Sequence, residues 1–203
     1  MRQKTVLSVF ALLVASPLLA QQSKGVSVEG GDPDDRASAR LLYWDNDANA
    51  AAGQLAINYG RPVWRKDYED PARFDAITKG KVWRMGSNFW SNLYTDVPVK
   101  ISGKAIAPGL YFLGLERSAD GSSWWLAFMD PIKIRQAHID AFDIRKAAVE
   151  FTAPMNLGPP SSSVVERLTI TLTHPDNEIR SATLQVAWGH LTLTAPVKVT
   201  VRE

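Results

Sequence analysis

The sequence predicts an all-β domain, either a β-sandwich or a partly closed barrel of mostly antiparallel strands, with two short helices. Short extended segments recur along the chain and are separated by turns rich in Gly, Pro, Asn and Asp. In the C-terminal third, Leu168, Ile170 and Leu172 alternate with threonines. Such alternation places one face of each strand in a core and the other toward water, which is typical of antiparallel sheets. The buried strands of a doubly wound α/β sheet would be continuous apolar runs, so the pattern argues against that class.

The first twenty residues are typical of a signal peptide. Arg2 and Lys4 form a basic start, residues 6–15 are apolar, and Ala20 supplies a small residue for cleavage. The apolar stretch is shorter than the roughly 20 residues that a membrane-spanning helix needs. We therefore expect residues 1–20 to be removed on export to the periplasm or the extracellular space. We expect no transmembrane segment in the mature protein.

The composition limits the partners of the mature chain. The full sequence has 23 basic and 21 acidic residues, and removal of residues 1–20 takes away Arg2 and Lys4, which leaves 21 of each. No basic run is present, so no nucleic-acid partner is expected. The chain has no cysteine, which excludes disulfides and thiolate metal sites. Residues 21–38 are polar and predict a flexible segment, and residues 39–203 predict a single β-rich domain.

The N-terminal part of the domain begins with strands and one helix. Residues 40–44 predict the first strand. Residues 54–59 predict the second, because apolar residues recur at every other position and Pro62 prevents its continuation. Asp70-Pro71 combines a helix N-cap with proline at the first helical position, so we expect a short helix over residues 72–77.

The loop between the first two strands resembles a calcium loop in one respect. Asp45, Asp47 and Asn49 alternate as the ligands of such a loop do. Alanine, however, stands where the loop needs a glycine for its sharp turn and where it needs a bidentate glutamate. We therefore interpret this segment as a polar hairpin loop and expect no metal site.

The centre of the chain, residues 79–115, predicts a β-meander. Its strands are separated by turn residues at Ser102-Gly103 and Pro108-Gly109. A further turn at residues 118–121 leads into a return strand over residues 123–129. The entrance of the meander holds an unusual group of residues, namely Trp83, Arg84, Gly86, Asn88 and Trp90.

The C-terminal half continues with one helix and several strands. Asp130-Pro131 repeats the cap followed by proline and predicts a second short helix with Phe142 on its apolar side. Residues 147–151 predict a strand, and the Pro- and Ser-rich residues 154–163 predict a loop. The last strands are predicted at residues 168–173, 182–188 and 191–201.

Several motifs resemble those of a known family. They are Tyr59-Gly60-Arg61-Pro62, residues 80–88 (Gly-Lys-Val-Trp-Arg-Met-Gly-Ser-Asn), residues 101–104, residues 107–111 and Trp125. In order and spacing they resemble the exported bacterial family known as domain of unknown function 2911, over residues 54–201. Phe89-Trp90-Ser91 after Asn88, and a longer insert that begins at Trp64, depart from the family pattern and indicate a divergent subgroup. The resemblance implies export and a β-rich domain, and it supplies no catalytic residue.

The candidate ligand-binding residues are Tyr59, Arg61, Trp83, Arg84, Asn88 and Trp90. Arg61 and Arg84 would form a fork for a carboxylate or phosphate group, because guanidinium groups pair with planar anions through two hydrogen bonds. Asn88 would hydrogen-bond a neighbouring carbonyl or hydroxyl group. The alternative is that both arginines pair with Asp or Glu of adjacent loops and that Asn88 bonds the backbone of its turn.

The seven tryptophans allow a second interpretation. Trp64, Trp90 and Trp124 could be exposed faces on which sugar rings stack. The alternative is that most of the tryptophans belong to the core, because aromatic rings bury large areas and favour strands.

Signals for catalysis are weak. His138, His174 and His190 show no metal-ligand spacing, and no nucleophile elbow, phosphate-binding loop or dinucleotide motif is present. We expect no cofactor. A carboxylate pair for glycoside hydrolysis could come from several acidic residues whose spacing selects none of them. These are Asp67, Glu69, Asp96, Glu116 and Asp140.

The function that the sequence favours is binding. We expect an exported module that binds a small ligand, a glycan or a protein surface. The alternatives are a hydrolase of cell-envelope polymers and a structural subunit that pairs with a partner through an edge strand.

Overall fold

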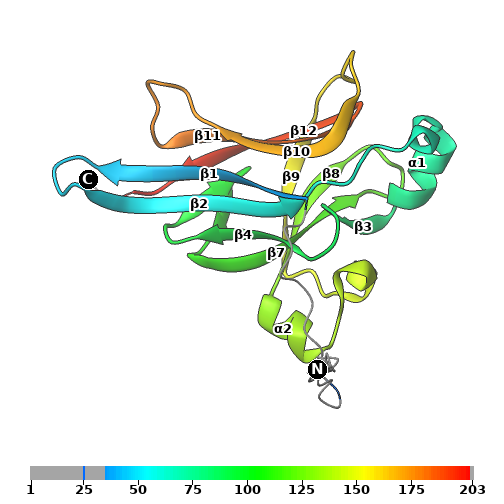
Figure 1. The fold of residues 1–203 in the computed structure, drawn as a ribbon, viewed down its shortest axis with the longest axis horizontal. Coiled ribbons are helices and arrows are strands. Elements are labelled where there is room, and N and C mark those ends of the chain that lie inside the picture. Colours follow the sequence, from blue (N-terminus) through cyan, green and yellow to red (C-terminus); the bar gives the residue numbers. More distant parts are fainter. Residues whose placement is uncertain (1–24, 26–34, 202–203) are drawn as a thin grey trace, which may run out of the picture. The chain divides into compact units, whose positions relative to one another are not determined.

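The computed structural model describes Gly25 and residues 35–201, so the predicted signal peptide and most of the predicted flexible segment lie outside the described residues. The described part is mostly antiparallel β-structure that does not close into a barrel, which confirms the all-β class (Figure 1). Its strands are β1 (Arg36–Asp45), β2 (Ala50–Gly60), β3 (Lys81–Arg84), β4 (Ser91–Thr95), β5 (Val99–Ile101), β6 (Lys104–Ile106), β7 (Gly109–Arg117), β8 (Trp124–Met129), β9 (Phe151–Leu157), β10 (Val165–Thr173), β11 (Ser181–Gly189) and β12 (Leu191–Val199). No helix of the described residues is long and apolar enough to cross a membrane.

The strands form two layers. One contains β1, β2, β3, β4, β7 and β8, and the other contains β10, β11 and β12 with the short β5–β6 hairpin. In Figure 1 the β10–β12 layer lies over β1 and β2. β9 joins the layers, because it pairs with β8 on one side and with β12 on the other.

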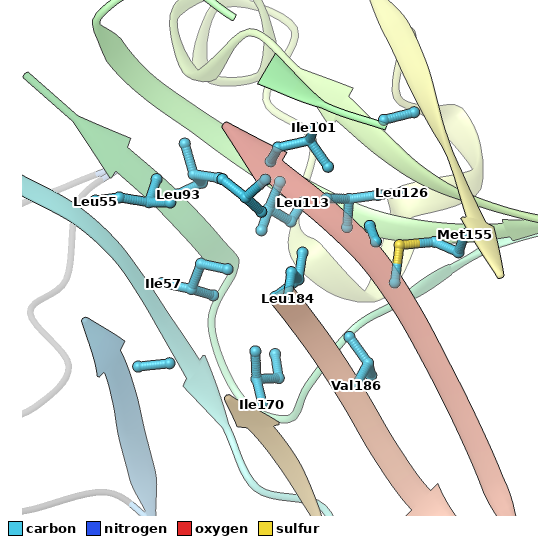
Figure 2. Close-up of a cluster of buried hydrophobic side chains, with 14 of the residues drawn as sticks. Leu55, Ile57, Leu93, Ile101, Leu113, Leu126, Met155, Ile170, Leu184 and Val186 are labelled. Atoms are coloured by element: carbon cyan, nitrogen blue, oxygen red, sulfur yellow. The ribbon is translucent and has the colours of Figure 1, made fainter. Parts of the chain in front are cut away.

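The main core fills the space between the layers. Figure 2 shows Leu55, Ile57 and Leu113 of the first layer and Ile170, Leu184 and Val186 of the second directed into the same space. The predicted alternation in the C-terminal third explains this arrangement: on β10 the inward Leu168 and Ile170 are buried, and Thr169 between them points outward.

Two short α-helices begin at the predicted caps. In α1 (Pro71–Thr78) the Asp70 side chain accepts a hydrogen bond from the backbone N–H of Ala72, and in α2 (Pro131–Gln136) Asp130 does the same for Ile132. The chain after α2 turns at His138, which has a φ of 53°, and then forms the 3₁₀ helix η2 (Ala141–Lys146). A second 3₁₀ helix, η1 (Lys66–Glu69), precedes α1.

α2 and η2 cover part of the outer face of the first layer and form a second, smaller core. Its buried residues are Trp90, Phe112, Met129, Ile134, Ala141 and Ile144.

One strand lies elsewhere than predicted. β9 spans Phe151–Leu157, where the prediction had a strand over residues 147–151 followed by a loop. Pro154 argued against a strand, since proline donates no ladder hydrogen bond. β12 pairs with β9 only at Asn156 and Leu157. At Pro154, β9 pairs with β8 alone, so β12 needs no hydrogen bond from this position.

The side chain of Tyr59 connects the two layers. Its hydroxyl group donates to the carbonyl of Ile170 at 3.2 Å and accepts from the N–H of the same residue at 2.9 Å. The ring is buried in the main core. A residue of β2 therefore satisfies two backbone groups of β10 across the interior.

We expect Tyr59→Phe to lower the free energy of unfolding by about 1–3 kcal/mol, because the buried N–H of Ile170 loses its acceptor. Urea unfolding measures the loss as a lower midpoint at an unchanged m-value. Tyr94→Phe is the matched control, since the Tyr94 side chain is 39% exposed on the outer face of β4 and its loss should cost little. Equal midpoints for the two variants would contradict the role assigned to Tyr59.

Candidate functional site

A cleft of about 630 Å³ lies between the end of α1, β3 and η2. We call it the Arg84 cleft. Trp83, Arg84 and Ile77 line it from β3 and α1, and Phe142 lines it from η2. Trp188, near the end of β11, adds a further aromatic ring from the second layer.

An aromatic cluster holds one wall of the cleft in place. Trp188 stacks on Trp83 with ring centres 5.6 Å apart, and it meets Trp64 and Tyr68 edge to face at 5.1 and 5.4 Å. The indole N–H of Trp188 donates to the carbonyl of Pro62 at 3.0 Å. Edge-to-face and offset-stacked rings attract each other beyond the area they bury, so the cluster is a stable wall.

The segment between β2 and β3 brings Trp64 to this cluster. The backbone N–H of Trp64 donates to the carbonyl of Glu166 at 2.6 Å. Its ring packs against Gly189, where an added Cβ atom would lie 2.3 Å from the indole. Gly189 also has a φ of 60°, which favours glycine, so the turn and the close contact both require this residue.

α1 is attached to the first layer by an ion pair. The carboxylate of Asp75 lies 2.7 Å from Lys79 Nζ and 2.7 Å from Arg117 Nη1. The hydrogen bonds from Lys79 and Arg117 lower the pKa of the Asp75 carboxyl below its usual value. Arg117 also donates to Thr78 at 2.8 Å and to the carbonyl of Gly121 at 3.0 Å, so α1 is fixed beside β7.

Arg84 lies where the ladder between β3 and β7 ends. Arg84, the last residue of β3, pairs with Gly114 of β7, and Ser91, the first residue of β4, pairs with the adjacent Leu113. Residues 85–90 therefore form a loop that leaves the ladder between these two positions. Ser91 Oγ donates to the carbonyl of Met85 and closes the base of this loop. The guanidinium group of Arg84 donates from Nη1 to the carbonyl of Asn88 at 2.7 Å.

The surroundings of the Arg84 guanidinium group are apolar on one side. Its Cζ atom lies 4.1 Å over the centre of the Phe142 ring. Burial lowers the pKa of Arg84, and the charge of the nearby Asp140 opposes this change. Among the described residues, no carboxylate lies within ion-pair distance of Arg84. The cleft therefore contains a partly dehydrated cation that the described carboxylates do not neutralise.

The structure brings two of the six predicted site residues to the cleft, Trp83 and Arg84. Tyr59 is buried between the layers. Arg61 does not line the cleft; its backbone N–H donates to the carbonyl of Asp35, and its Nε atom is buried without a partner among the described residues. Asn88 is exposed with a φ of 60° and contributes its carbonyl group to Arg84.

The tryptophans proposed as sugar-stacking faces are mostly covered. Trp90 is 9% exposed and stacks on Phe112 with ring centres 4.9 Å apart, and Trp124 is 3% exposed. Trp64 belongs to the aromatic cluster. Trp44, which the sequence interpretation did not select, is 50% exposed on β1.

Other lining residues were not predicted. Phe142 and Trp188 come from segments that are adjacent to Arg84 only in the folded chain. A strand was predicted over residues 182–188, but the sequence did not indicate which space the Trp188 ring borders. Lys146 and Arg145 also line the cleft from η2. No local sequence signal connects these positions.

Several of the described acidic side chains cap turns or form ion pairs. Asp45 Oδ1 accepts the N–H groups of Asp47 and Ala48 and thereby caps its turn. Asp140 caps η2 through the N–H of Phe142. The carboxylate that lines the cleft, Asp143, pairs with Lys146 at 2.9 Å. Within residues 35–201 no three His, Asp or Glu side chains lie close enough to hold a metal ion.

We expect Arg84→Met to change the free energy of unfolding by less than about 1 kcal/mol, because loss of one hydrogen bond is offset by removal of a partly buried charge. Arg117→Met should be clearly more destabilising, since Arg117 bonds Asp75, Thr78 and Gly121. Urea unfolding of both variants measures the difference. A greater loss of stability in Arg84→Met than in Arg117→Met would identify Arg84 as a structural residue.

A family model described as "Protein of unknown function (DUF2911)" matches residues 45–197. No curated protein and no solved structure matches the chain.

Proposed function

The chain belongs to the DUF2911 family, whose description assigns no activity, and we propose that it is a binding domain that holds a small organic molecule in the Arg84 cleft. The resemblance noted in the sequence is thereby confirmed for the family.

The observation that carries the proposal is the combination of an open cleft and a rigid aromatic wall. A space of about 630 Å³ is within the range of roughly 300–1,000 Å³ that small-molecule sites occupy. The stacked rings of Trp83 and Trp188 border it, and Ile77 and Phe142 add apolar surface. A few charged groups at the edge, Arg84 among them, would orient the ligand.

The alternative functions have less support. Stacking of sugars on exposed rings needs rings that are open to solvent, and Trp90 and Trp124 are buried. Hydrolysis of glycosidic bonds needs two carboxylates on either side of one space. Of the acidic residues considered, Asp67 pairs with Arg65 and Asp96 accepts from the N–H of Gln54, on separate parts of the domain.

A cleft-filling substitution tests the proposal. Ile77→Trp places a large ring in the cleft, whereas Ile132→Trp makes the same change at a side chain that is 67% exposed on α2. A panel of aromatic and aliphatic fragments is screened by NMR, and a fragment counts as a hit if it shifts backbone amide signals with a dissociation constant of about 1 mM or lower. We expect hits to shift amides of β3 and η2 in the natural chain and in Ile132→Trp, and the shifts to be lost in Ile77→Trp. Hits that persist unchanged in Ile77→Trp would contradict the cleft as the binding site.

We further propose that the protein acts after export. The support is the basic start, the apolar residues 6–15 and the small residue Ala20. Expression in a bacterial host followed by mass spectrometry of the periplasmic and extracellular fractions should give a chain that begins at Gln21. An intact chain that begins at Met1 and remains in the cytoplasm would contradict this proposal.

A further inference from the structure

We infer that the Arg84 cleft recognises the carboxylate group of an acid with an aromatic or aliphatic body, and that the group binds the Nε/Nη2 edge of Arg84. This inference rests on the proposed function and adds the chemical class of the ligand. It follows from the hydrogen-bond donors of Arg84, the charges around them and the surface beside them.

One edge of the Arg84 guanidinium group has no protein partner in the part of the chain that the structure describes. Nη1 donates to the carbonyl of Asn88 at 2.7 Å, and the Phe142 contact is made with the ring. Neither Nε nor Nη2 donates to a described acceptor. The Nε atom of Arg61 is fully buried and has no partner among the described residues. No nitrogen of Arg84 is buried in this way, so the free donors of Arg84 remain accessible to a ligand.

The Nε/Nη2 edge is suited to a carboxylate. The same protein shows the geometry at Arg65, where Nε and Nη2 lie 3.0 and 3.2 Å from the two carboxylate oxygens of Asp67. Two parallel N–H groups match the two oxygens of a planar acid group, and the charge strengthens both hydrogen bonds. Arg84 lines the cleft, and this edge has no protein partner among the described residues, so a ligand can supply the acceptor that Asp67 supplies to Arg65.

The charges of the lining favour an anion. Arg84, Arg145 and Lys146 are basic, and the acidic lining residue is Asp143, which is already paired with Lys146. Burial lowers the pKa of Arg84, which means that the protein dehydrates its cation without a full counter-charge. A bound carboxylate would supply that charge.

The surface beside this edge is apolar. The Trp83 and Trp188 rings, the Ile77 side chain and the Phe142 ring line the same space as Arg84. A small hydrophilic anion would leave these groups without contact, whereas an acid with a ring or an alkyl chain would cover them. A planar carboxylate uses both of its oxygens on one guanidinium edge, whereas a phosphate ester, which can pair with the same edge, has a further oxygen that needs another donor.

Three matched probes test the inference: 2-naphthoate, its neutral amide 2-naphthamide, and 2-naphthyl phosphate. They are titrated against the natural chain, Arg84→Lys and Arg135→Lys, with amide shifts and the Nε–H signal of Arg84 as readouts. Arg135 is the control because its guanidinium group also lies over an aromatic ring, that of Phe112, but outside the cleft.

We expect the acid to bind at least about tenfold more tightly than the amide and to shift the Nε–H signal of Arg84, because charged hydrogen bonds contribute more than neutral ones. Arg84→Lys should remove most of this preference while amide binding stays the same, which also shows that the cleft is still folded. Arg135→Lys should keep the preference.

Several results would overturn the inference. Equal affinity of the cleft for the acid and the amide would contradict recognition of a carboxylate group, but it would leave the proposed function in place. A preference for the acid that survives Arg84→Lys would show that the two-donor edge of the guanidinium group is not what recognises the carboxylate. Tighter binding of 2-naphthyl phosphate than of 2-naphthoate would show that the ligand class is a phosphate and not a carboxylate. If neither acid nor amide shifted any cleft residue at about 1 mM, the proposed function would fail together with the inference.

Discussion

The packing of Trp64 against Gly189 and Trp188 is the contact on which the candidate site depends. It fixes the segment between β2 and β3 to the end of the second layer, and the backbone hydrogen bond from Trp64 to Glu166 fixes the same segment a second time. α1 follows in this segment, held by Asp75 and Arg117. Without this attachment the cleft would lose one wall, so a site on the first layer depends on a glycine turn in the second.

The other wall results from an interruption of a strand. β3 and β4 pair with the same side of β7, and residues 85–90 leave the ladder between them. Gly86 approaches Gly60 so closely that an added Cβ atom would lie 3.2 Å from the Gly60 backbone. This close approach lets the loop fold back, and the carbonyl of Asn88 then meets Arg84. The position of Arg84 therefore depends on the close approach of Gly86 to Gly60.

Much of the fold follows from local sequence signals, whereas most of the cleft does not. Alternation predicted β10, β11 and β12, and the Asp-Pro pairs predicted where α1 and α2 begin. β9 was misplaced because proline counts against a strand only where a neighbouring strand needs a backbone N–H donor at that position, and β12 does not pair with β9 at Pro154. Trp83 and Arg84 were selected as unusual residues, but the burial of Tyr59 and Trp90 depends on tertiary contacts across the sheet and under α2 and η2. The ring of Phe142 reaches Arg84 only through the path of the chain after α2, which no periodicity in the sequence specifies.

The narrow link through β9 affects how the domain opens. Between the layers, the ladder of β9 and β12 consists of the pairs Asn156–Thr194 and Leu157–Leu193, whereas β11 and β12 pair along their whole length. Protection against hydrogen exchange tends to follow such cooperative units. Separation of β10, β11 and β12 as one unit from the first layer would keep their internal ladder but would break the main core and the hydrogen bonds of Tyr59 to Ile170. Trp188 belongs to this unit and Arg84 does not, so a sub-global opening of this kind would divide the cleft along its aromatic wall and give a ligand a route in and out.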